Sequence, residues 1–492
     1  MASCDNRSVC PPLPMNSRVI IVGQTLAGLT AALRLQTAGY RVTIVGEAQD
    51  MDITRPCSRE ESGDASLLGL SSRLLASSPL PWIFHHCQTA TLTLLKHLAA
   101  DNYLDPRCRT RLEFIPRRGK SYIFPHYRLP LAGRLGLGVL TFRALPLYDR
   151  WRLANYLEKV WEGLLAFPRD LDYQSVETWL NTIGQGRDTK LTVWEPLCRF
   201  LLGGSIATCT ASQFLRVLHR MFRDPRGGTR FHLPVLACQA SLVSRVRNRL
   251  LAAGATFVPQ ASPSVFQIHD NRVDGIQLQD GTVLKGEWFI FALPLSHMKA
   301  WLPERLLARF SFFYNLAQLP LWPAVTVHIS LSHPLWTPRF LLTTGPFHWL
   351  TIRHLEYPVS SQLILSCVAV GDPMIMAQSD TELLHAALDV MRTYWPDLHQ
   401  AFPPSAFQHV IIRAPQAFFA TDPSATAICP TNQSPLPNLL VAGEWTDPGW
   451  LDSIESAIRS GNACAAIIQT KNGHSSRVDN LRSGPLTSTH DA

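Results

Sequence analysis

The sequence predicts an α/β protein in which one parallel-sheet domain, assembled from discontinuous segments, is joined to a second, mixed α+β domain. Two observations lead to this fold class. Residues 18–45 read as strand, helix and strand, which is the pattern of a β-α-β unit. Residues 439–469, near the other end of the chain, read as a buried strand, a glycine turn and a helix. With 492 residues, the chain is long enough for two domains.

The amino-terminal unit has glycines at the point where a strand leads into a helix. Gly23 follows the first strand and permits a tight turn, and Gly28 lets the helix Leu26–Thr37 pack closely on that strand. The unpaired N–H groups at the start of the helix can bind a pyrophosphate. Glu47 follows the second strand, where a carboxylate can accept hydrogen bonds from both ribose hydroxyls. This order of elements predicts dinucleotide binding; a purely structural β-α-β unit is the alternative.

One position departs from the G-x-G-x-x-G pattern of such sites. The middle glycine is replaced by Thr25, whose Cβ stands where the pyrophosphate would approach. We expect either that the Thr25 hydroxyl donates a hydrogen bond to a phosphate, or that the affinity for the dinucleotide is reduced.

The carboxy-terminal unit contains a second glycine turn followed by an acid. Gly443 and Glu444 come directly after the strand Leu439–Ala442, and the helix Ser453–Gln469 follows. Glu444 can bind the ribityl chain or a phosphate-bound water. The start of the helix, at Ser453 and Ile454, can direct N–H groups at the N1/C2=O edge of a flavin, where negative charge gathers on reduction. An NAD enzyme does not need this second module, so the cofactor predicted here is FAD.

The middle of the chain supplies the remaining segments. Three antiparallel strands are predicted at Val265–His269, Arg272–Gln279 and Thr282–Phe291, and residues 144–165 and 174–223 have helical periodicity. We therefore expect a flexible leader (1–16), an FAD-binding domain (17–85, 230–300 and 415–470), a substrate domain (86–229 and 301–414) and a disordered tail (471–492).

In these features the chain resembles the FAD-dependent amine oxidase/phytoene desaturase superfamily, whose FAD-binding domain is Rossmann-like and of the glutathione-reductase type. The antiparallel stretch that closes on Ala292-Leu293-Pro294 is similar to an insert of that superfamily. The resemblance implies that the backbone of Val265 binds the adenine. It also implies a cofactor contact for Arg55, which is retained where the superfamily has a G-G-R run whose glycines are replaced here.

A narrower resemblance comes from several blocks that follow one another in a fixed order. They are Ala144–Leu153, Thr178–Leu180, Trp194–Cys198, Ala324–Ile329 and Arg413–Phe418. Together they are similar to hydroxysqualene dehydroxylase, the squalene-associated flavoprotein family of bacterial hopanoid biosynthesis, and the similarity covers about residues 17–470. One departure is the stretch 78–82, which reads Ser-Pro-Leu-Pro-Trp where that family usually has an Asp-Asn-Gly-Gln-His run.

The resemblance implies an oxidoreductase that replaces an allylic hydroxyl with hydride from reduced flavin. The C–O bond would ionise to an allylic cation, a proton would turn the leaving hydroxide into water, and an apolar tunnel would hold the isoprenoid. The proton donor cannot be chosen from the sequence, so no catalytic residue is assigned. The side chains considered for that role are His85, His86, His219, His232, His328 and Glu195.

Positive charge is concentrated in one part of the sequence. The net charge is +8, and the segment from Arg107 to Lys159 holds twelve Lys or Arg against Glu113, Asp149 and Glu158. Leu, Phe, Tyr and Trp are interleaved with these charges, which suits peripheral contact with anionic lipid headgroups. A solvated basic face is the alternative. Nucleic acid is not expected, because no recognition motif accompanies the charge.

Targeting signals and metal-binding patterns are not found in the sequence. There is no apolar run of about 18 residues and no signal peptide at the start, so we expect a protein of the cytoplasm or of the cytosolic face of the membrane. The 11 cysteines show neither CxxC pairs nor zinc spacing, which predicts reduced thiols and no metal site.

Two alternative functions stay open. The first is another reaction on the same fold, as in a carotenoid-type desaturase or an amine oxidase. The second is a catalytically silent relative that binds lipid or a partner, which Thr25 and the altered stretches 53–54 and 78–82 favour. Bound flavin, visible as a yellow colour of the purified protein, distinguishes the enzymes from the silent relative.

Overall fold

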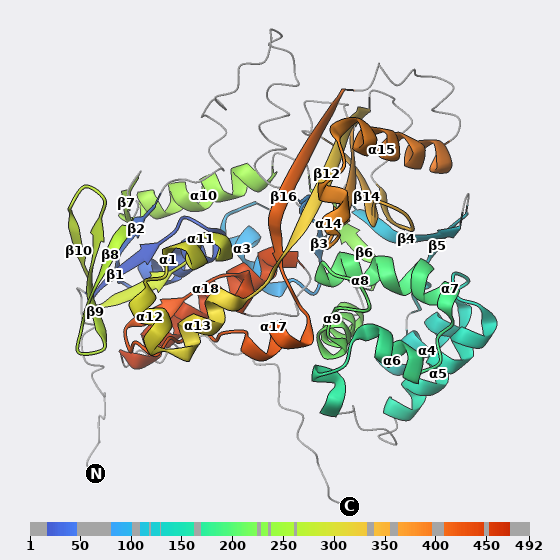
Figure 1. Cartoon of the computed structure of the whole chain (residues 1–492), viewed down its shortest axis with the longest axis horizontal. Helices are drawn as coiled ribbons and strands as arrows, with labels where there is room; N and C mark the ends of the chain where they lie inside the picture. Colours follow the sequence, from blue (N-terminus) through green and yellow to red (C-terminus); the bar gives the residue numbers. More distant parts are fainter. Residues whose placement is uncertain are drawn as a thin grey trace, which may run out of the picture.

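The structure is a computed structural model and describes thirteen segments of the chain. They are 17–46, 80–100, 109–117, 120–127, 129–161, 169–223, 228–234, 238–259, 263–331, 339–354, 363–395, 408–446 and 452–472. A five-stranded parallel sheet lies on the left of Figure 1, and a nine-stranded mixed sheet lies on the right beside a group of helices. Within these segments, no helix is both long enough and apolar enough to cross a membrane.

The parallel sheet has the strand order β17-β11-β1-β2-β7. Its strands are β1 (Arg18–Val22), β2 (Arg41–Val45), β7 (Thr256–Val258), β11 (Trp288–Phe291) and β17 (Leu439–Val441). All four pairings are parallel, so strands from both ends and the middle of the chain lie side by side. Short runs of Val, Ile, Leu and Phe suit strands that are covered on both faces. The predicted Rossmann-like domain built from discontinuous segments is confirmed.

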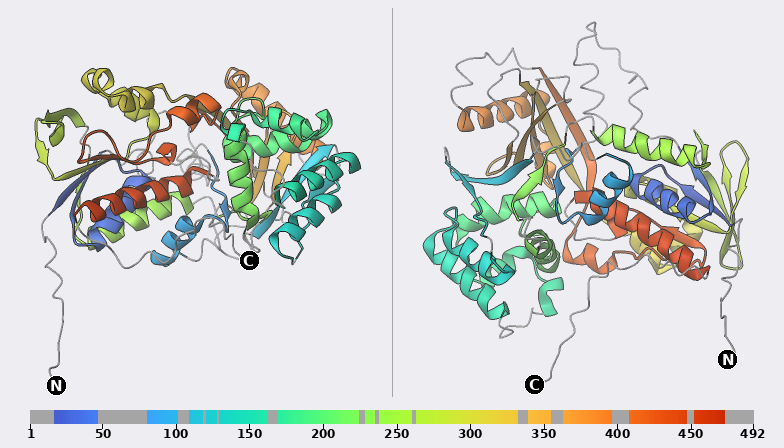
Figure 2. Two further views of the ribbon diagram at one scale, coloured as in Figure 1. Left: turned by 90° about the horizontal axis from the view of Figure 1, so that it is seen from below. Right: turned by 180° about the vertical axis from the view of Figure 1, so that it is seen from behind.

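Three helices pack against one face of the parallel sheet. They are α1 (Leu26–Thr37), α10 (Cys238–Ala252) and α18 (Asp452–Lys471), and α1 contacts both of the others. Figure 2 shows the red α18 running beside the blue α1. One buried cluster joins β1 to all three helices through Ile21, Leu29, Leu250 and Ala465. The last helix of the chain therefore stabilises the first β-α-β unit.

A small antiparallel sheet follows the predicted hairpins. Its strands are β8 (Pro263–His269), β9 (Arg272–Leu278) and β10 (Val283–Lys285). The single strand predicted at Thr282–Phe291 is wrong, because β10 ends at Lys285 and β11 starts at Trp288. A Cβ on Gly286 would stand 2.8 Å from Ile20 Cγ1. The chain thus passes close over β1 at this glycine and moves from the antiparallel sheet to the parallel one.

The nine-stranded sheet has the order β16-β12-β15-β14-β13-β4-β6-β3, with β5 paired to β4. Its strands are β3 (Phe84–His85), β4 (Arg109–Arg117), β5 (Lys120–Ile123), β6 (Arg230–His232), β12 (Leu321–Leu331), β13 (Arg339–Thr343), β14 (Trp349–His354), β15 (Leu363–Val370) and β16 (His409–Phe419). β12 and β15 pair antiparallel with each other.

Some predicted domain boundaries differ from the strand pairing. Residues 84–85, 230–232 and 415–419 were assigned to the FAD-binding domain, but β3, β6 and β16 all pair within the nine-stranded sheet. For β3 and β6, the physical reason is that a strand of two or three residues is defined by its partner and not by its own periodicity. For β16, the predicted boundary at residue 415 falls inside one strand, His409–Phe419. The leader 1–16 and residues 473–492 of the tail lie outside the described residues.

The remaining helices lie on the opposite face of the parallel sheet, around the large sheet or between the two. They are α3 (Thr89–His97), α4 (Leu131–Thr141), α5 (Leu147–Trp161), η3 (Arg169–Asp172), α6 (Val176–Thr182), α7 (Arg187–Thr189), η4 (Lys190–Trp194), α8 (Glu195–Leu202), α9 (Ala211–Arg223), α11 (Leu295–Trp301), α12 (Glu304–Arg309), α13 (Ser311–Gln318), α14 (Pro373–Met376), α15 (Asp380–Tyr394), α17 (Pro423–Ile428) and η6 (Glu444–Thr446). The helical segment 174–223 is interrupted at Gly203, which ends α8 with a φ of +75°.

Candidate functional site

The Gly23 turn lies at the carboxyl edge of the parallel sheet. A Cβ on Gly23, whose φ is +107°, would stand 2.2 Å from the Ala292 carbonyl oxygen. A Cβ on Gly28 would stand 2.6 Å from the Gly23 oxygen and 2.8 Å from Ala292 Cβ. Both positions therefore need glycine because the end of β1, the start of α1 and the end of β11 approach so closely. Cofactor binding at these glycines stays a prediction.

Thr25 is the N-cap of α1 and also ties the helix to the neighbouring strand. Its Oγ1 accepts a hydrogen bond from the Gly28 N–H at 3.3 Å and donates one to the Ala292 oxygen at 2.7 Å. The hydroxyl proton is thus bonded within the protein, which contradicts the expectation that it donates to a phosphate. The cap leaves the N–H groups of Leu26 and Ala27 at the helix start, where an anion can accept from them.

The second glycine turn lies at the same edge of the sheet, and one strand, β11, lies between it and the first. β11 pairs with β1 on one side and with β17 on the other, and the register aligns Val22, Phe291 and Val441. Because neighbouring strands lie about 4.8 Å apart, the Gly23 and Gly443 turns are separated by roughly 10 Å. The two turns can therefore contact opposite parts of one elongated ligand.

Side chains of α18 and η6 hold the Gly443 turn in place. The Gly443 N–H donates to Ser460 Oγ at 2.9 Å, and Thr446 Oγ1 donates to the Gly443 oxygen at 2.8 Å. The fully buried Trp445 lies against the same turn, and its Nε1 has no hydrogen-bond partner among the described residues. Glu444 is half-buried between them, and its predicted role stays a prediction.

The starts of α1 and α18 are brought together by close packing. A Cβ on Gly461 would stand 2.2 Å from the Ala27 oxygen, so the two helices cross in backbone contact. Leu26 at the start of α1 and Ile454 at the start of α18 also belong to one buried cluster, which includes Trp82. The segment before α3 therefore joins the two predicted cofactor motifs.

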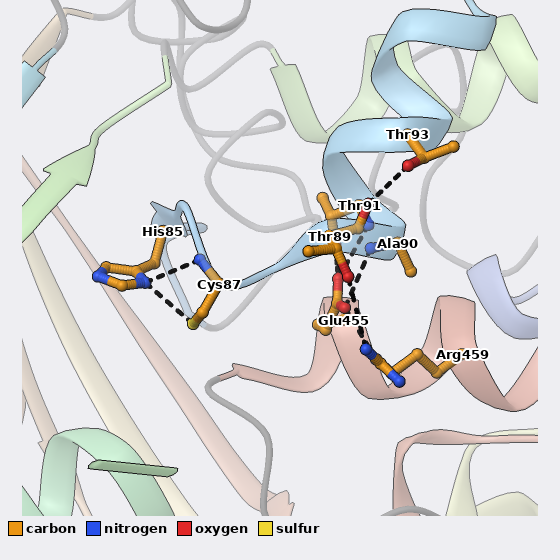
Figure 3. A network of polar contacts seen from close by, with 8 residues as sticks. All are labelled: His85, Cys87, Thr89, Ala90, Thr91, Thr93, Glu455 and Arg459. Carbon is orange, nitrogen blue, oxygen red and sulfur yellow. Dashed lines mark hydrogen bonds and ion pairs between the residues drawn. The ribbon is translucent and has the colours of Figure 1, made fainter. Parts of the chain in front are cut away.

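A buried carboxylate that the sequence did not point to connects α18 with α3. Glu455, in the first turn of α18, is fully buried and accepts hydrogen bonds from the Ala90 N–H at 3.1 Å and the Thr91 N–H at 2.9 Å (Figure 3). The Thr91 hydroxyl donates at 2.8 Å and Arg459 Nε donates at 2.9 Å. The Glu455 carboxylate points to the start of α3 and accepts its hydrogen bonds there. It therefore does not cover the N–H groups at the start of α18, and the positive end of the α18 dipole can face a ligand.

These residues fit FAD. The cofactor needs an anion site for its pyrophosphate and a positive group near the N1/C2=O edge of its flavin. The start of α1 can supply the first, and the start of α18, with Ser453 in its first turn, can supply the second; both roles stay predictions. The buried and unpaired Trp445 Nε1 is a further donor beside the Gly443 turn.

The structure does not describe the cofactor contacts predicted for three other residues. Glu47 and Arg55 lie outside the described residues. Val265 lies in β8, pairs with Gln277 of β9 and has a side chain that is 50% exposed. The predicted contacts of all three with FAD stay predictions.

His85, one of the candidate proton donors, is committed to structural hydrogen bonds. The Cys87 N–H donates to His85 Nδ1 at 3.1 Å, so the proton lies on Nε2, which is 3.0 Å from the Gly228 oxygen. The ring is buried, and the Cys87 sulfur also lies 2.9 Å from Nδ1 (Figure 3). His85 therefore anchors the segment that leads into α3.

The adjacent His86 pairs with a second histidine from the large sheet. Its ring meets that of His232 edge to face, with the ring centroids 5.5 Å apart. Burial, together with His86 and Arg109 nearby, lowers the pKa of His232 to about 4, so His232 is neutral at physiological pH. His232 Nδ1 is buried and has no partner among the described residues. The pair lies where β3 and β6 meet, next to the start of α3.

Two further candidates have structural roles. Glu195 accepts hydrogen bonds from Arg199 Nε at 2.6 Å and from the Ile206 N–H at 2.9 Å, so it stabilises the end of α8 and the following turn. His328 is buried in β12 with its Nδ1 2.9 Å from Ser366 Oγ. Burial lowers the pKa of His328 to about 3, which keeps it neutral.

The chain matches a known protein family over most of its length. The family model for flavin containing amine oxidoreductases matches residues 79–469. This chain belongs to that family. Its cofactor is FAD, and it is an FAD-dependent oxidoreductase. The match begins after the Gly23 turn, so the role of the amino-terminal unit in the FAD site rests on its position in the fold and stays a prediction.

Several curated relatives are desaturases. A 15-cis-phytoene desaturase of Synechococcus elongatus is 23% identical over 92% of this chain and 95% of the relative. A probable zeta-carotene desaturase of the same organism is 21% identical over 92% of this chain and 98% of the relative. A 15-cis-phytoene desaturase of Solanum lycopersicum is 28% identical, but over only 41% of this chain and 36% of the relative.

Solved structures share the fold at low sequence identity. An oxidoreductase from Methanosarcina mazei superposes with a TM-score of 0.61 at 15% identity and covers 91% of this chain and 99% of its own. A putrescine oxidase variant from a redesign of cofactor binding has a TM-score of 0.64 at 15% identity and covers 93% and 99%. These likenesses confirm the fold class, an FAD-binding domain with a substrate domain.

Proposed function

We propose that this oxidoreductase acts on an isoprenoid lipid and removes the hydroxyl group of hydroxysqualene to give squalene, a step of hopanoid biosynthesis. The observation that carries the substrate class is the full-length similarity to desaturases named for phytoene and zeta-carotene, which are long isoprenoid hydrocarbons. The ordered sequence blocks between Ala144 and Phe418 support dehydroxylation, because they resemble hydroxysqualene dehydroxylases.

The reaction needs a hydride, a proton and a dry site. Reduced FAD, when bound, supplies the hydride to the carbon that loses the hydroxyl group. The protein has to deliver a proton, so that the hydroxyl group leaves as water, and to shield the allylic cation from solvent. A large apolar cluster of the second domain begins beside the histidine pair, with Ile83, Cys87 and Phe231 among its members.

His86 is the histidine that we assign as proton donor. His85, His328 and Glu195 are bound to structural partners. His86 is half-buried, and its ring lies against that of His232 next to the start of α3. The neutral His232 beside it can accept a hydrogen bond from a protonated imidazole. The pair can therefore hold one proton next to the start of α3, and α3 is joined to α18 through Glu455.

A desaturase is the second candidate function, and the same full-length similarity favours it. Desaturation transfers hydride from the substrate to the oxidised cofactor, which is the opposite direction. The direction of hydride transfer therefore separates the two candidates. A silent relative would show neither transfer.

The test is a single turnover without oxygen. FAD-loaded protein is reduced anaerobically and mixed with hydroxysqualene, and squalene and the absorbance of oxidised flavin are measured together. We expect one squalene for each flavin reoxidised. In parallel, oxidised protein is mixed with phytoene: flavin reduction with a desaturated product would replace our proposal with the second candidate. A protein that binds FAD but does neither would support the silent relative.

The role of His86 is tested in the same assay. His86→Gln should slow squalene formation about a hundredfold while FAD binding is unchanged, because general acid catalysis of this kind contributes two or more orders of magnitude. His97→Gln, at the exposed end of α3, is the matched control. An unchanged rate and an unchanged pH profile in His86→Gln would remove His86 from the mechanism.

A further inference from the structure

Large apolar side chains are exposed in one region of the second domain. Among the described residues, fifteen such side chains are exposed, and seven of them lie between residues 123 and 151. The most exposed of the seven are Leu147 at 77%, Trp151 at 60% and Tyr148 at 59%. Isolated exposed apolar residues are common on protein surfaces, but a group of this kind indicates an interaction site.

Most of these side chains lie on two neighbouring helices, α4 and α5, at one corner of the fold. On α4, Leu137 and Leu140 follow Gly133 at helical spacing on one exposed face. A Cβ on Gly133 would stand 3.7 Å from Leu129, so Leu129 extends this face. The short turn after α4 leads into α5, whose first two turns expose Leu147, Tyr148 and Trp151. Leu137, Leu140, Leu147, Tyr148 and Trp151 are called the α4–α5 corner below.

The opposite face of α4 is already packed in the protein. Phe124 lies against Gly138, where an added Cβ would stand 2.7 Å from its ring, and Val139 is buried. The buried Arg134 donates to the Phe222 oxygen of α9 at 2.7 Å. The exposed leucines of α4 are therefore not needed for packing against the rest of the chain.

The charge around the corner is positive. Arg143, Arg150 and Arg152 lie between residues 137 and 157, and the one acid in this stretch, Asp149, is buried and accepts from the Gly186 N–H. The Arg152 guanidinium lies 4.5 Å from the centre of the Tyr148 ring. Exposed apolar side chains with arginines beside them match an anionic lipid surface, in which hydrocarbon and negative headgroups lie next to each other.

We infer that the α4–α5 corner docks this protein on an anionic membrane surface, with Leu147, Tyr148 and Trp151 entering the headgroup region. The predicted membrane contact of segment 107–159 is thereby narrowed to one corner, formed by α4, α5 and the turn between them. Figure 1 shows these two helices at the lower right, at the opposite end of the molecule from the parallel sheet. This inference concerns the location of the protein and does not depend on which reaction it catalyses.

Vesicle binding of the FAD-loaded full chain tests this inference. The protein is sedimented with vesicles of phosphatidylcholine alone, or of phosphatidylcholine mixed with phosphatidylglycerol, at low and high salt. We expect binding to the mixed vesicles that weakens with salt, because screening shortens the range of the charges. Leu147→Gln combined with Trp151→Gln should weaken binding at least about tenfold. Arg143→Gln should weaken it about fivefold, and on the anionic vesicles only.

Matched controls distinguish binding through the α4–α5 corner from nonspecific binding of exposed apolar or charged side chains to vesicles. Met374→Gln combined with Tyr314→Gln changes residues of similar exposure, 75% and 55%, outside the corner and should leave binding unchanged. Arg305→Gln is the exposed charge control. Flavin content reports folding of every variant without any turnover, so failure of the proposed reaction would not affect this result.

Three outcomes would overturn the inference. The first is that the wild-type protein does not bind anionic vesicles. The second is that the corner and control variants lose binding equally. The third is that light scattering shows a dimer that the corner variant splits into monomers, in which case the corner is an interface between two copies of the chain.

Discussion

Replacing Glu455 with glutamine tests whether the start of α18, the start of α3 and the FAD site form one unit. Both carboxylate oxygens face only donors: one accepts from the Ala90 N–H and Arg459 Nε, and the other accepts twice from Thr91. The glutamine amide has the same shape, but its NH₂ group must face two donors in either orientation. The variant therefore removes the charge and leaves buried N–H groups unpaired.

The expected loss can be estimated from these contacts. A hydrogen bond to a charged group contributes about 1.5–3 kcal/mol, a neutral one about 1 kcal/mol, and an unpaired buried donor costs about 1–3 kcal/mol. We therefore expect Glu455→Gln to destabilise the contact between α3 and α18 by about 3 kcal/mol, which corresponds to roughly a hundredfold change in local opening. Because α18 also holds the Gly443 turn through Ser460, FAD should be bound more weakly.

Hydrogen exchange measured by mass spectrometry is the assay, together with FAD retention after ultrafiltration. Amide protection in α3 should fall while protection in the large sheet is unchanged. Glu195→Gln is the control, because Glu195 also pairs with an arginine four residues later and with a backbone N–H, but it lies in the second domain. Unchanged α3 protection in Glu455→Gln, or equal FAD loss in Glu195→Gln, would refute the reasoning.

Three further predictions follow from the same site and from the buried histidines. Gly28→Ala should lower the free energy of unfolding by about 1–3 kcal/mol and should also lower the FAD content, because the new methyl group would meet the Gly23 oxygen. Full FAD retention would contradict this. Thr25→Val should remove the helix cap and lower the free energy of unfolding by about 1 kcal/mol. Thr25→Ser should keep the hydrogen bonds and the wild-type melting temperature. The pKa of His328 is about 3 in the folded chain and 6.5 in the unfolded one, so acid favours unfolding between these values, by about 2 kcal/mol at roughly pH 5. His328→Gln should therefore unfold less steeply with acid in a pH titration of stability; an unchanged titration would exclude His328 as the cause.

The sequence alone was sufficient for the features that depend on neighbouring residues. Apolar runs predicted the buried strands β1, β2 and β17, and helical spacing predicted α1 and α18 within a few residues of their bounds. Gly23 and Gly28 could be identified because a tight turn and a close helix–strand contact both require a missing side chain. From these units the sequence predicted the FAD site at two distant turns.

Only the tertiary structure decided which groups meet across the chain. The Thr25 hydroxyl bonds to Ala292, which is 267 residues away, and Glu455 meets Thr91 across 364 residues. The short strand β6 likewise exists only because it pairs with β3 and β4. Local periodicity reports which face of a segment is buried, but not what covers it. The sequence therefore does not show which group a hydroxyl or carboxylate near a helix start will contact. Here the packing of strands and helices decided the hydrogen-bond partners of Thr25 and Glu455.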